Sequence, residues 1–492
     1  MDNNIISKIL ADYPDAWKDA KRFKALLLDF LPEDKRLRNL IVISVEERIP
    51  DDIFQSKSED ALQENAYVKR LVNAVGCSND DARVVVNLWI VARSSQVFEN
   101  HSSKLFSVGF PAYDELTEWQ LSIVNLPLDK NYVIKGAHGT GKTTVAIYRV
   151  LQASRDKKVL YLVSNRSGLF KVQKIINSLG SIGNNVEVKT YVSWITDLIN
   201  ADKISTARFK AYDLDWQEIE KQSMELAPES VPFIVADDAE KMPIELFRII
   251  CRVSKNTTCM ITPTDESCGQ LSVVDAIINL CVEAPYTLTQ NLRNTKEIIE
   301  VAKLYTSKYL PDSTRQSGHK PIMIEAQLTD QCQCIAQIIR RNLEKRIGVI
   351  VQEKSLSAIW SRLNDLVGDE CELFTLTKEK MGEPGVTMCS IFSSAGMDFE
   401  LVILPMFDKL SFGSEGETRE IIYELICKAK HELYILYGSD KLNTSGFTPM
   451  TPLVKFRQLC EWSFYGENKE ENSLDVPTID DEIGPVSRFS TK

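Results

Sequence analysis

The feature that most constrains this chain is the segment GAHGTGKTT at residues 136–144, which fits the pattern G-x-x-x-x-G-K-[ST]. It directly follows the apolar run NYVIK and precedes TTVAIYRVLQ, whose apolar spacing is typical of a helix. A glycine-rich turn between a strand and a helix gathers backbone N–H groups at the positive end of the helix dipole, where they can surround phosphate oxygens. The segment therefore predicts a phosphate-binding loop.

This loop also predicts a metal site. Lys142 is expected to reach the β- and γ-phosphate oxygens of a nucleotide, and the Thr143 hydroxyl to hold Mg²⁺. A partner acid should end a neighbouring buried strand, and PFIVADDAEKMP supplies two. Asp237 is expected to hold the water shell of the metal, and Asp238 to orient or deprotonate the attacking water. Two acids at a strand end are otherwise often a helix N-cap. The predicted cofactors are ATP and Mg²⁺.

The apolar pattern divides the chain into regions. From residue 131 onward, short apolar runs alternate with amphipathic stretches in two successive series, which predicts parallel α/β sheets. The first hundred residues instead show the three-to-four spacing of short helices. The predicted regions are a helical module at 1–100, a linker at 101–111, a first lobe at 112–285, a second lobe at 286–462 and an acidic, disordered tail at 463–492.

Composition excludes several classes of protein. Lys and Arg number 58 against 69 Asp and Glu, a formal charge of −11, so no chain-wide basic field attracts nucleic acid, although a local basic groove is compatible with this charge. Four histidines and 11 cysteines without a Cys-x-x-Cys pair favour buried reduced thiols over a zinc site. The acidic start and the lack of a run of about 18 apolar residues predict a cytoplasmic protein without a membrane span.

From about residue 112 to 440, the order of motifs resembles the superfamily 1 helicases of the UvrD/Rep type. LTEWQLSIV is similar to the adenine-reading segment, which makes Gln120 its glutamine. LTQNLRNTKEIIEVA is similar to the segment whose arginine reaches the γ-phosphate from the second lobe, which makes Arg293 that arginine. YELICKAKHELYIL is similar to the last motif and places Lys428 where the family has arginine. The resemblance implies two tandem RecA-like P-loop NTPase lobes behind the small N-terminal all-α domain.

VTMCSIFSSAGMDFELVIL is similar to a further family motif, T-x-H-x-x-K-G-L-E-F, and places Gly396 and Asp398 at the nucleotide. The predicted catalytic residues are Lys142, Asp237, Asp238, Arg293 and Lys428. The predicted nucleotide-binding residues are Gln120, Gly136, Gly139, Thr140, Gly141, Lys142, Thr143, Thr144, Gly396 and Asp398, and the metal residues are Thr143 and Asp237.

Several positions depart from the family pattern. Asp238 replaces a glutamate, which shortens the side chain by one methylene, and Lys428 replaces an arginine, which removes a bidentate fork. Phe392 and Ala395 replace a histidine and a lysine, and Glu240 replaces a glutamine. Binding of ATP is expected to survive these substitutions, whereas hydrolysis is expected to be slow.

Two segments bear on partners. VKTYVSWI resembles the family segment that contacts single strands, and Tyr191 and Trp194 could stack bases or equally be core residues beside the sheet. Residues 16–95 resemble a helical adaptor module of bacterial multidomain effectors, which implies a protein partner; a helical domain that merely covers the first lobe is the alternative.

Three functions are compatible with these features. The first is a slowly hydrolysing ATPase of the helicase type that acts on single-stranded DNA or RNA. The second is a nucleotide-dependent regulatory switch that signals to a protein through the N-terminal module. The third is a structural protein with a vestigial fold, against which the intact phosphate loop argues because glycines are costly to retain without a use.

Overall fold

The structure is a computed structural model of the 492-residue chain. It describes residues 5–55, 61–107, 110–155, 157–179, 185–200, 214–226, 230–254, 256–261, 271–280, 284–306, 310–315, 317–368, 370–374, 384–438 and 446–465. The chain divides into two compact units, residues 1–289 and 290–492.

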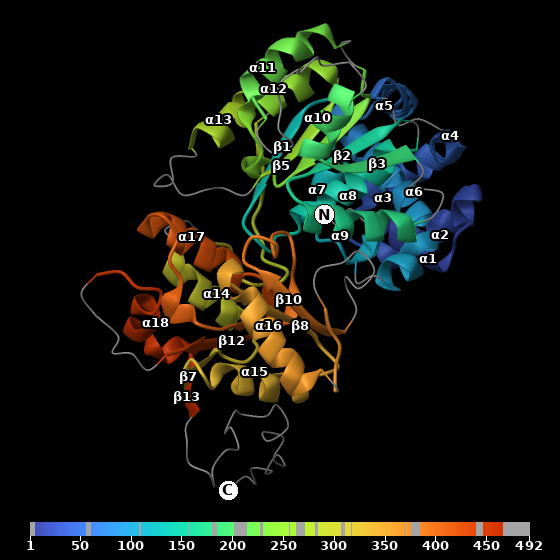
Figure 1. The fold of residues 1–492 in the computed structure, drawn as a ribbon. Coiled ribbons are helices and arrows are strands. Elements are labelled where there is room, and N and C mark those ends of the chain that lie inside the picture. The colour runs from blue at the N-terminus through green and yellow to red at the C-terminus, as the bar shows by residue number, and fades with distance from the viewer. Residues whose placement is uncertain are drawn as a thin grey trace, which may run out of the picture. The chain divides into compact units, whose positions relative to one another are not determined.

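Unit 1 begins with an all-α segment (Figure 1). Its helices are α1 (Ile5–Asp12), α2 (Ala20–Phe30), α3 (Lys35–Glu46), α4 (Ile49–Gln55), α5 (Ala61–Val75) and α6 (Asn79–Ser107). They share an apolar core in which the fully buried rings of Phe23 and Trp89 lie 5.3 Å apart, and the Trp89 indole donates a hydrogen bond to Ser44. The segment therefore has a core of its own, as the apolar spacing predicts.

The rest of unit 1 is a six-stranded parallel sheet with strand order β3-β2-β4-β5-β1-β6. The strands are β1 (Tyr132–Gly136), β2 (Val159–Val163), β3 (Val186–Thr190), β4 (Phe233–Asp237), β5 (Thr257–Ile261) and β6 (Tyr286–Leu288). The helices are α7 (Glu118–Val124), α8 (Lys142–Ala153), α9 (Arg166–Ser178), α10 (Tyr191–Asn200), α11 (Trp216–Gln222), α12 (Ile244–Val253) and α13 (Leu271–Leu280).

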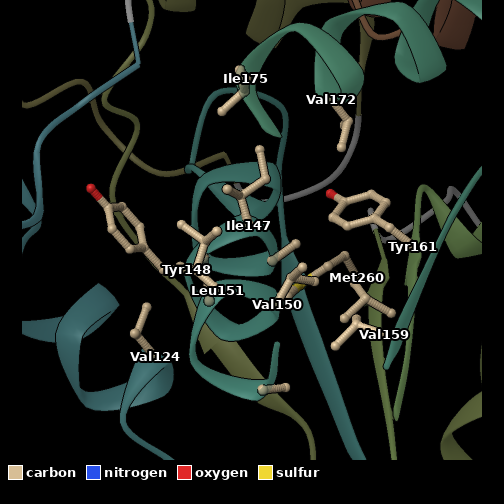
Figure 2. Packing of buried hydrophobic residues seen from close by; sticks show 14 of the residues in the cluster. Val124, Ile147, Tyr148, Val150, Leu151, Val159, Tyr161, Val172, Ile175 and Met260 are labelled. Atoms are coloured by element: carbon tan, nitrogen blue, oxygen red, sulfur yellow. The ribbon is translucent and has the colours of Figure 1, made fainter. Parts of the chain in front are cut away.

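Both faces of this sheet are covered, which is why its strands are continuous apolar runs. Helices α7, α8 and α9 contribute to the core on one face, and α10 to α13 to the core on the other. Figure 2 shows the first of these cores, in which Tyr148 and Leu151 of α8 lie among residues that include Tyr161 and Met260 of the strands.

Unit 2 is a seven-stranded parallel sheet with strand order β13-β7-β12-β11-β8-β10-β9. The strands are β7 (Ile322–Ala326), β8 (Arg346–Val351), β9 (Leu373–Phe374), β10 (Gly385–Ser390), β11 (Phe399–Leu404), β12 (Ala429–Tyr437) and β13 (Glu461–Tyr465). The helices are α14 (Lys296–Ala302), α15 (Gln331–Arg340), α16 (Glu353–Val367), α17 (Glu415–Ile426) and α18 (Thr451–Lys455). The predicted fold class is confirmed: two tandem α/β lobes follow an all-α segment.

Three local features differ from the sequence expectation. Helix α6 continues to Ser107, into the range expected to be a linker, because no glycine or proline interrupts residues 80–108. Strand β6 pairs with β1 in the first sheet although 286 was expected to begin the second lobe; its three residues are too few to show a period. Strand β13 extends to Tyr465, into the expected tail, and pairs with β7; residues 466–492 lie outside the described residues.

Among the helices that the structure describes, none combines the length and the hydropathy needed to cross a membrane.

Candidate nucleotide-binding site

The phosphate loop connects β1 to α8 and has the backbone that its glycines were expected to permit. Gly139 and Gly141 have φ of 84° and 88°, the left-handed region that favours glycine, and Gly141 is the N-cap of α8. A Cβ added to Gly136 would lie 2.3 Å from Thr140 Oγ1, so the loop closes tightly at this residue. The loop therefore depends on glycine at three of its positions.

The side chains of the loop are held against its own backbone. The Lys142 ammonium donates hydrogen bonds to the carbonyls of Gly136 at 2.8 Å and Ala137 at 3.2 Å. The buried Thr140 hydroxyl also donates to Ala137, at 2.9 Å. The cation of Lys142 thus lies within the loop that it is predicted to serve, only 7% exposed.

Strand alternation brings Asp237 to this loop. Phe233, Val235 and Asp237 of β4 alternate with residues that belong to the core on the other face. Asp237 therefore ends β4 on the face covered by α8. The Thr143 hydroxyl, in the first turn of that helix, donates a 2.8 Å hydrogen bond to Asp237 Oδ2. The structure thus joins the two residues that were predicted to share a metal ion.

A third residue at this position was not predicted. The Tyr161 hydroxyl, on β2, donates a hydrogen bond of 2.9 Å to the same Oδ2 of Asp237. Val163 is the register partner of Asp237, so Tyr161 lies two residues earlier on the same face of the sheet. The alternation of KVLYLV could have identified this face, but nothing in the sequence gives the register between β2 and β4.

Burial shapes the electrostatics of these groups. Burial, followed by the charge of Asp238, raises the pKa of Asp237, while hydrogen bonds from Thr143 and Tyr161 and the charge of Lys142 lower it. Burial and the nearby charge of Asp237 raise the pKa of Tyr161 well above its usual range, so this hydroxyl keeps its proton. The protonated phenol is consequently a permanent donor to Asp237.

The residues present fit a nucleotide with Mg²⁺. Mg²⁺ prefers oxygen ligands and is usually held by one or two protein oxygens together with phosphate oxygens and waters. Thr143 and Asp237 offer a hydroxyl and a carboxylate side by side, next to a loop whose backbone surrounds Lys142. Among the residues that the structure describes, there is no cluster of three or more His, Cys, Asp or Glu side chains that could hold a metal ion.

Asp238 has an unusual backbone. Its φ of 54° is left-handed, a conformation that aspartate tolerates better than most residues. It occupies the N-cap position of the 3₁₀ turn Ala239–Lys241, but its carboxylate makes no capping hydrogen bond. Asp238 therefore stands at an N-cap position, as the N-cap alternative expects, but its side chain does not cap the turn.

Gln120 contacts the phosphate loop from α7. Its Oε1 accepts from the Thr117 amide at 3.1 Å in a capping box, and its Nε2 donates to the Thr140 carbonyl at 3.4 Å. The side chain is buried. Both ends of this amide are thus engaged by the protein, and the adenine-reading role stays a prediction.

In unit 2, Arg293 lies in a backbone bend that asparagine side chains hold by hydrogen bonds. The Asn291 side-chain oxygen accepts hydrogen bonds from the amides of Arg293 and Asn294, each at 3.0 Å. The Asn294 amide group donates to the carbonyls of Cys427 and Ala429, which ties the turn to the segment after α17. This second anchor fixes the backbone that carries Arg293.

Asp398 gathers cations near this turn. Its carboxylate lies 2.6 Å from Lys430 Nζ and 3.9 Å from the guanidinium groups of both Arg293 and Arg346. Glu400 lies 3.8 Å from Arg346, so three cations meet two carboxylates. The predicted nucleotide residue Asp398 therefore pairs with the predicted phosphate-contacting Arg293.

Lys428 occupies a different environment. Its side chain is 4% exposed, and its ammonium donates to the Ser394 carbonyl at 3.0 Å and pairs with Glu424 at 3.4 Å. Gly396, two residues after Ser394, has a φ of 75°. Lys428 is thus bound inside unit 2, with Gly396 in the connection between β10 and β11.

The aromatic candidates for base stacking differ in exposure. Trp194 is 6% exposed and belongs to the core on the α12 face of the sheet, so the core alternative applies to it. Tyr191 is half-buried against Trp216, with ring centroids 5.7 Å apart. Phe392, which replaces a family histidine, is 68% exposed and forms a T-shaped ring pair with Phe412.

Comparisons with known proteins give similarities of fold at low identity. No protein-family model matches the chain, and no curated protein matches it. The C-terminal domain of a possible DNA helicase from Lactobacillus plantarum is 18% identical, with 35% of this chain and 98% of that chain covered and a TM-score of 0.26.

Two structures of S. cerevisiae Dbp5 are also similar. One, bound to Gle1 and IP6, is 13% identical, with 76% of this chain and 93% of that chain covered and a TM-score of 0.47. The other, bound to Nup159, Gle1, IP6 and ADP, is 12% identical, with 75% and 95% covered and a TM-score of 0.44.

Proposed function

We propose that this chain binds ATP with Mg²⁺ at the phosphate loop of unit 1 and hydrolyses it slowly. The observation that carries the proposal is the hydrogen bond between Thr143 and Asp237, directly beside a loop whose backbone conformation requires glycine. A glycine-rich loop of the right pattern can occur by chance, but chance does not also place a buried carboxylate 2.8 Å from its threonine.

The proposal assigns a role to the phosphate loop and to the side chains beside it. The loop amides and the N-terminus of α8 receive the phosphates, and Lys142 exchanges its loop carbonyls for phosphate oxygens. The proton of the Thr143 hydroxyl is directed to Asp237, which leaves the lone pairs of its oxygen to a metal ion. Bound Mg²⁺ would neutralise charge on the phosphates, and Asp238 would orient the attacking water.

Unit 2 is proposed to supply Arg293 to the γ-phosphate. The turn that holds its backbone is fixed by Asn291 and Asn294, while its guanidinium is only loosely paired with Asp398 at 3.9 Å. A guanidinium on a fixed turn can reach a phosphate at a small entropic cost. Lys428 is less suited to this task, because its ammonium is already bound to Ser394 and Glu424.

We further infer a helicase-type ATPase that acts on single-stranded DNA or RNA, from the order of the motifs along the chain. The regulatory switch is the second candidate, and the burial of Trp194 favours it, because this ring cannot stack a base from within the core. In either case, the all-α segment is proposed to bind a protein partner, since it has its own core.

Equilibrium binding of a fluorescent ATP analogue, with and without Mg²⁺, tests the nucleotide site. Lys142→Ala should weaken binding by about 100-fold through the lost charge-assisted contacts. Lys221→Ala, at an exposed lysine on α11, is the matched control and should bind like the wild type. Equal affinity of Lys142→Ala and the control would refute the site.

An ATPase assay with and without single-stranded DNA or RNA separates the two candidates. Stimulation by an oligonucleotide supports the helicase-type function, and the stimulating strand identifies the nucleic acid. Hydrolysis that is indifferent to both, together with no change in anisotropy of a labelled strand at about 50 mM salt, leaves the switch.

A further inference from the structure

Tyr161 is a fully buried tyrosine whose hydroxyl reaches the proposed metal site. It lies on β2 in the core between the sheet and α8, where its neighbours are mostly aliphatic. A phenol hydroxyl buried there without a hydrogen-bond partner would carry a free-energy cost, because it gives up its hydrogen bonds to water. Its hydrogen bond to Asp237 Oδ2, at 2.9 Å, removes that cost and connects the core to the site.

The Asp237 carboxylate is held by three donors. Tyr161 and Thr143 both donate to Oδ2, and the amide of Asp238 donates to Oδ1 at 3.2 Å. Thr143 approaches from α8 and Tyr161 from a neighbouring strand, so the two hydroxyls hold one oxygen from two different elements. A carboxylate can rotate about its last bond, and donors from several elements remove this freedom.

We propose that Tyr161 is a positioning residue of the Mg²⁺ site: its hydroxyl fixes the carboxylate of Asp237 so that Oδ2 meets Thr143. This inference rests on the proposed function, because it concerns the same site. It assigns Tyr161 no contact with nucleotide or metal. Its effect passes entirely through Asp237.

A purely structural role of the Tyr161 hydroxyl can be distinguished from a positioning role, because the same core contains a second buried tyrosine for comparison. Tyr148 of α8 is also fully buried in the same core, and its hydroxyl donates a 2.9 Å hydrogen bond to the Pro111 carbonyl. Figure 2 shows the two tyrosines on opposite sides of α8. Replacement of either residue by phenylalanine removes one buried hydroxyl from the same core, but only one of these hydroxyls touches Asp237.

The experiment compares Tyr161→Phe with Tyr148→Phe in the full chain. Thermal melts without nucleotide or Mg²⁺ measure the structural cost, which should be similar for the two variants. The affinity for a fluorescent ATP analogue is then titrated against Mg²⁺. Only Tyr161→Phe should raise the half-saturating Mg²⁺ concentration, by about tenfold, as is typical when the hydrogen-bond partner of a metal-site group is removed. Its affinity for the analogue in EDTA should equal that of Tyr148→Phe.

A second comparison uses Asp237→Asn with and without Tyr161→Phe. The effect of Tyr161→Phe on the Mg²⁺ titration should disappear in this background, because the residue acts through the missing carboxylate. Equal Mg²⁺ titrations for Tyr161→Phe and Tyr148→Phe, or an effect that persists in Asp237→Asn, would overturn the inference. Failure of the proposed function has another signature: the wild type itself would then bind the analogue without any dependence on Mg²⁺.

Discussion

The Thr143 hydroxyl and Asp237 Oδ2 lie 2.8 Å apart although 94 positions separate them in the sequence. Thr143 belongs to the first turn of α8, and Asp237 to the end of β4. The sheet brings them together because β1, which leads into α8, and β4 lie on either side of β5. A carboxylate with a hydroxyl at this distance is an oxygen pair suited to a hard cation.

Loss of the Thr143 hydroxyl should therefore impair metal use more than nucleotide binding. Thr143→Ala should raise the Mg²⁺ concentration that half-saturates binding of an ATP analogue by about 10-fold or more. Thr143→Ser keeps a hydroxyl and should remain close to the wild type. The two titrations decide the matter, and similar behaviour of the alanine and serine variants would show that the hydroxyl has no part in metal binding.

Asp238→Glu should have two opposite effects. The longer side chain should speed hydrolysis at saturating ATP, since it moves the carboxylate towards the water that it orients. The left-handed φ of 54° disfavours glutamate, so the same change should destabilise unit 1 by about 1 kcal/mol. Asp238→Asn is the control: it suits the backbone and lacks the charge, and it should hydrolyse ATP more slowly than the wild type. If Asp238→Glu hydrolyses ATP no faster than the wild type, the shorter side chain of aspartate is not what slows hydrolysis.

The comparison of Asp238 with Tyr161 shows what sequence can predict. The phosphate loop, the two acids at the end of β4 and the two α/β lobes follow from local patterns, because consecutive residues are enough to identify a glycine-rich turn or a buried strand. The contact of Tyr161 with Asp237 depends on the register of β2 against β4, which no local pattern contains. The same limit applies to Lys428, whose burial against Ser394 and Glu424 is set by tertiary packing.

Arg293→Ala should lower the rate of ATP hydrolysis by about 10³-fold and leave ATP affinity within a few-fold of the wild type. An arginine that contacts the γ-phosphate acts mainly in the transition state, when charge on the transferred group grows. Arg340→Ala is the matched control in unit 2, because that arginine pairs with Glu370 on the surface. Steady-state kinetics with both variants give the answer, and equal rates for the two would remove Arg293 from the site.

The buried thiols should resist alkylation in the folded protein. Burial raises the pKa of Cys334, Cys389 and Cys427 to about 12, so almost no thiolate is present at pH 8. Cys77 is partly exposed and should react readily. Mass spectrometry after brief iodoacetamide treatment should find Cys77 modified and these three intact until denaturant is added. Rapid modification of the three in the native state would mean that unit 2 opens readily.

Removal of the buried guanidinium of Arg149 should strongly destabilise unit 1. It is fully buried in α8 and donates hydrogen bonds to the carbonyls of Ile123, Val124 and Leu126 at the end of α7. Arg149→Met would remove the side-chain donor that these carbonyls share, at a cost of about 3 kcal/mol or more in the free energy of unfolding. Because α7 also carries Gln120, which contacts the phosphate loop, the variant should bind ATP more weakly even below its melting temperature.

Arg248→Met, at an arginine whose side chain is 50% exposed, is the control and should change the free energy of unfolding by no more than about 0.5 kcal/mol. Urea unfolding of the three proteins measures the difference, and a variant as stable as this control would show that the end of α7 does not depend on Arg149.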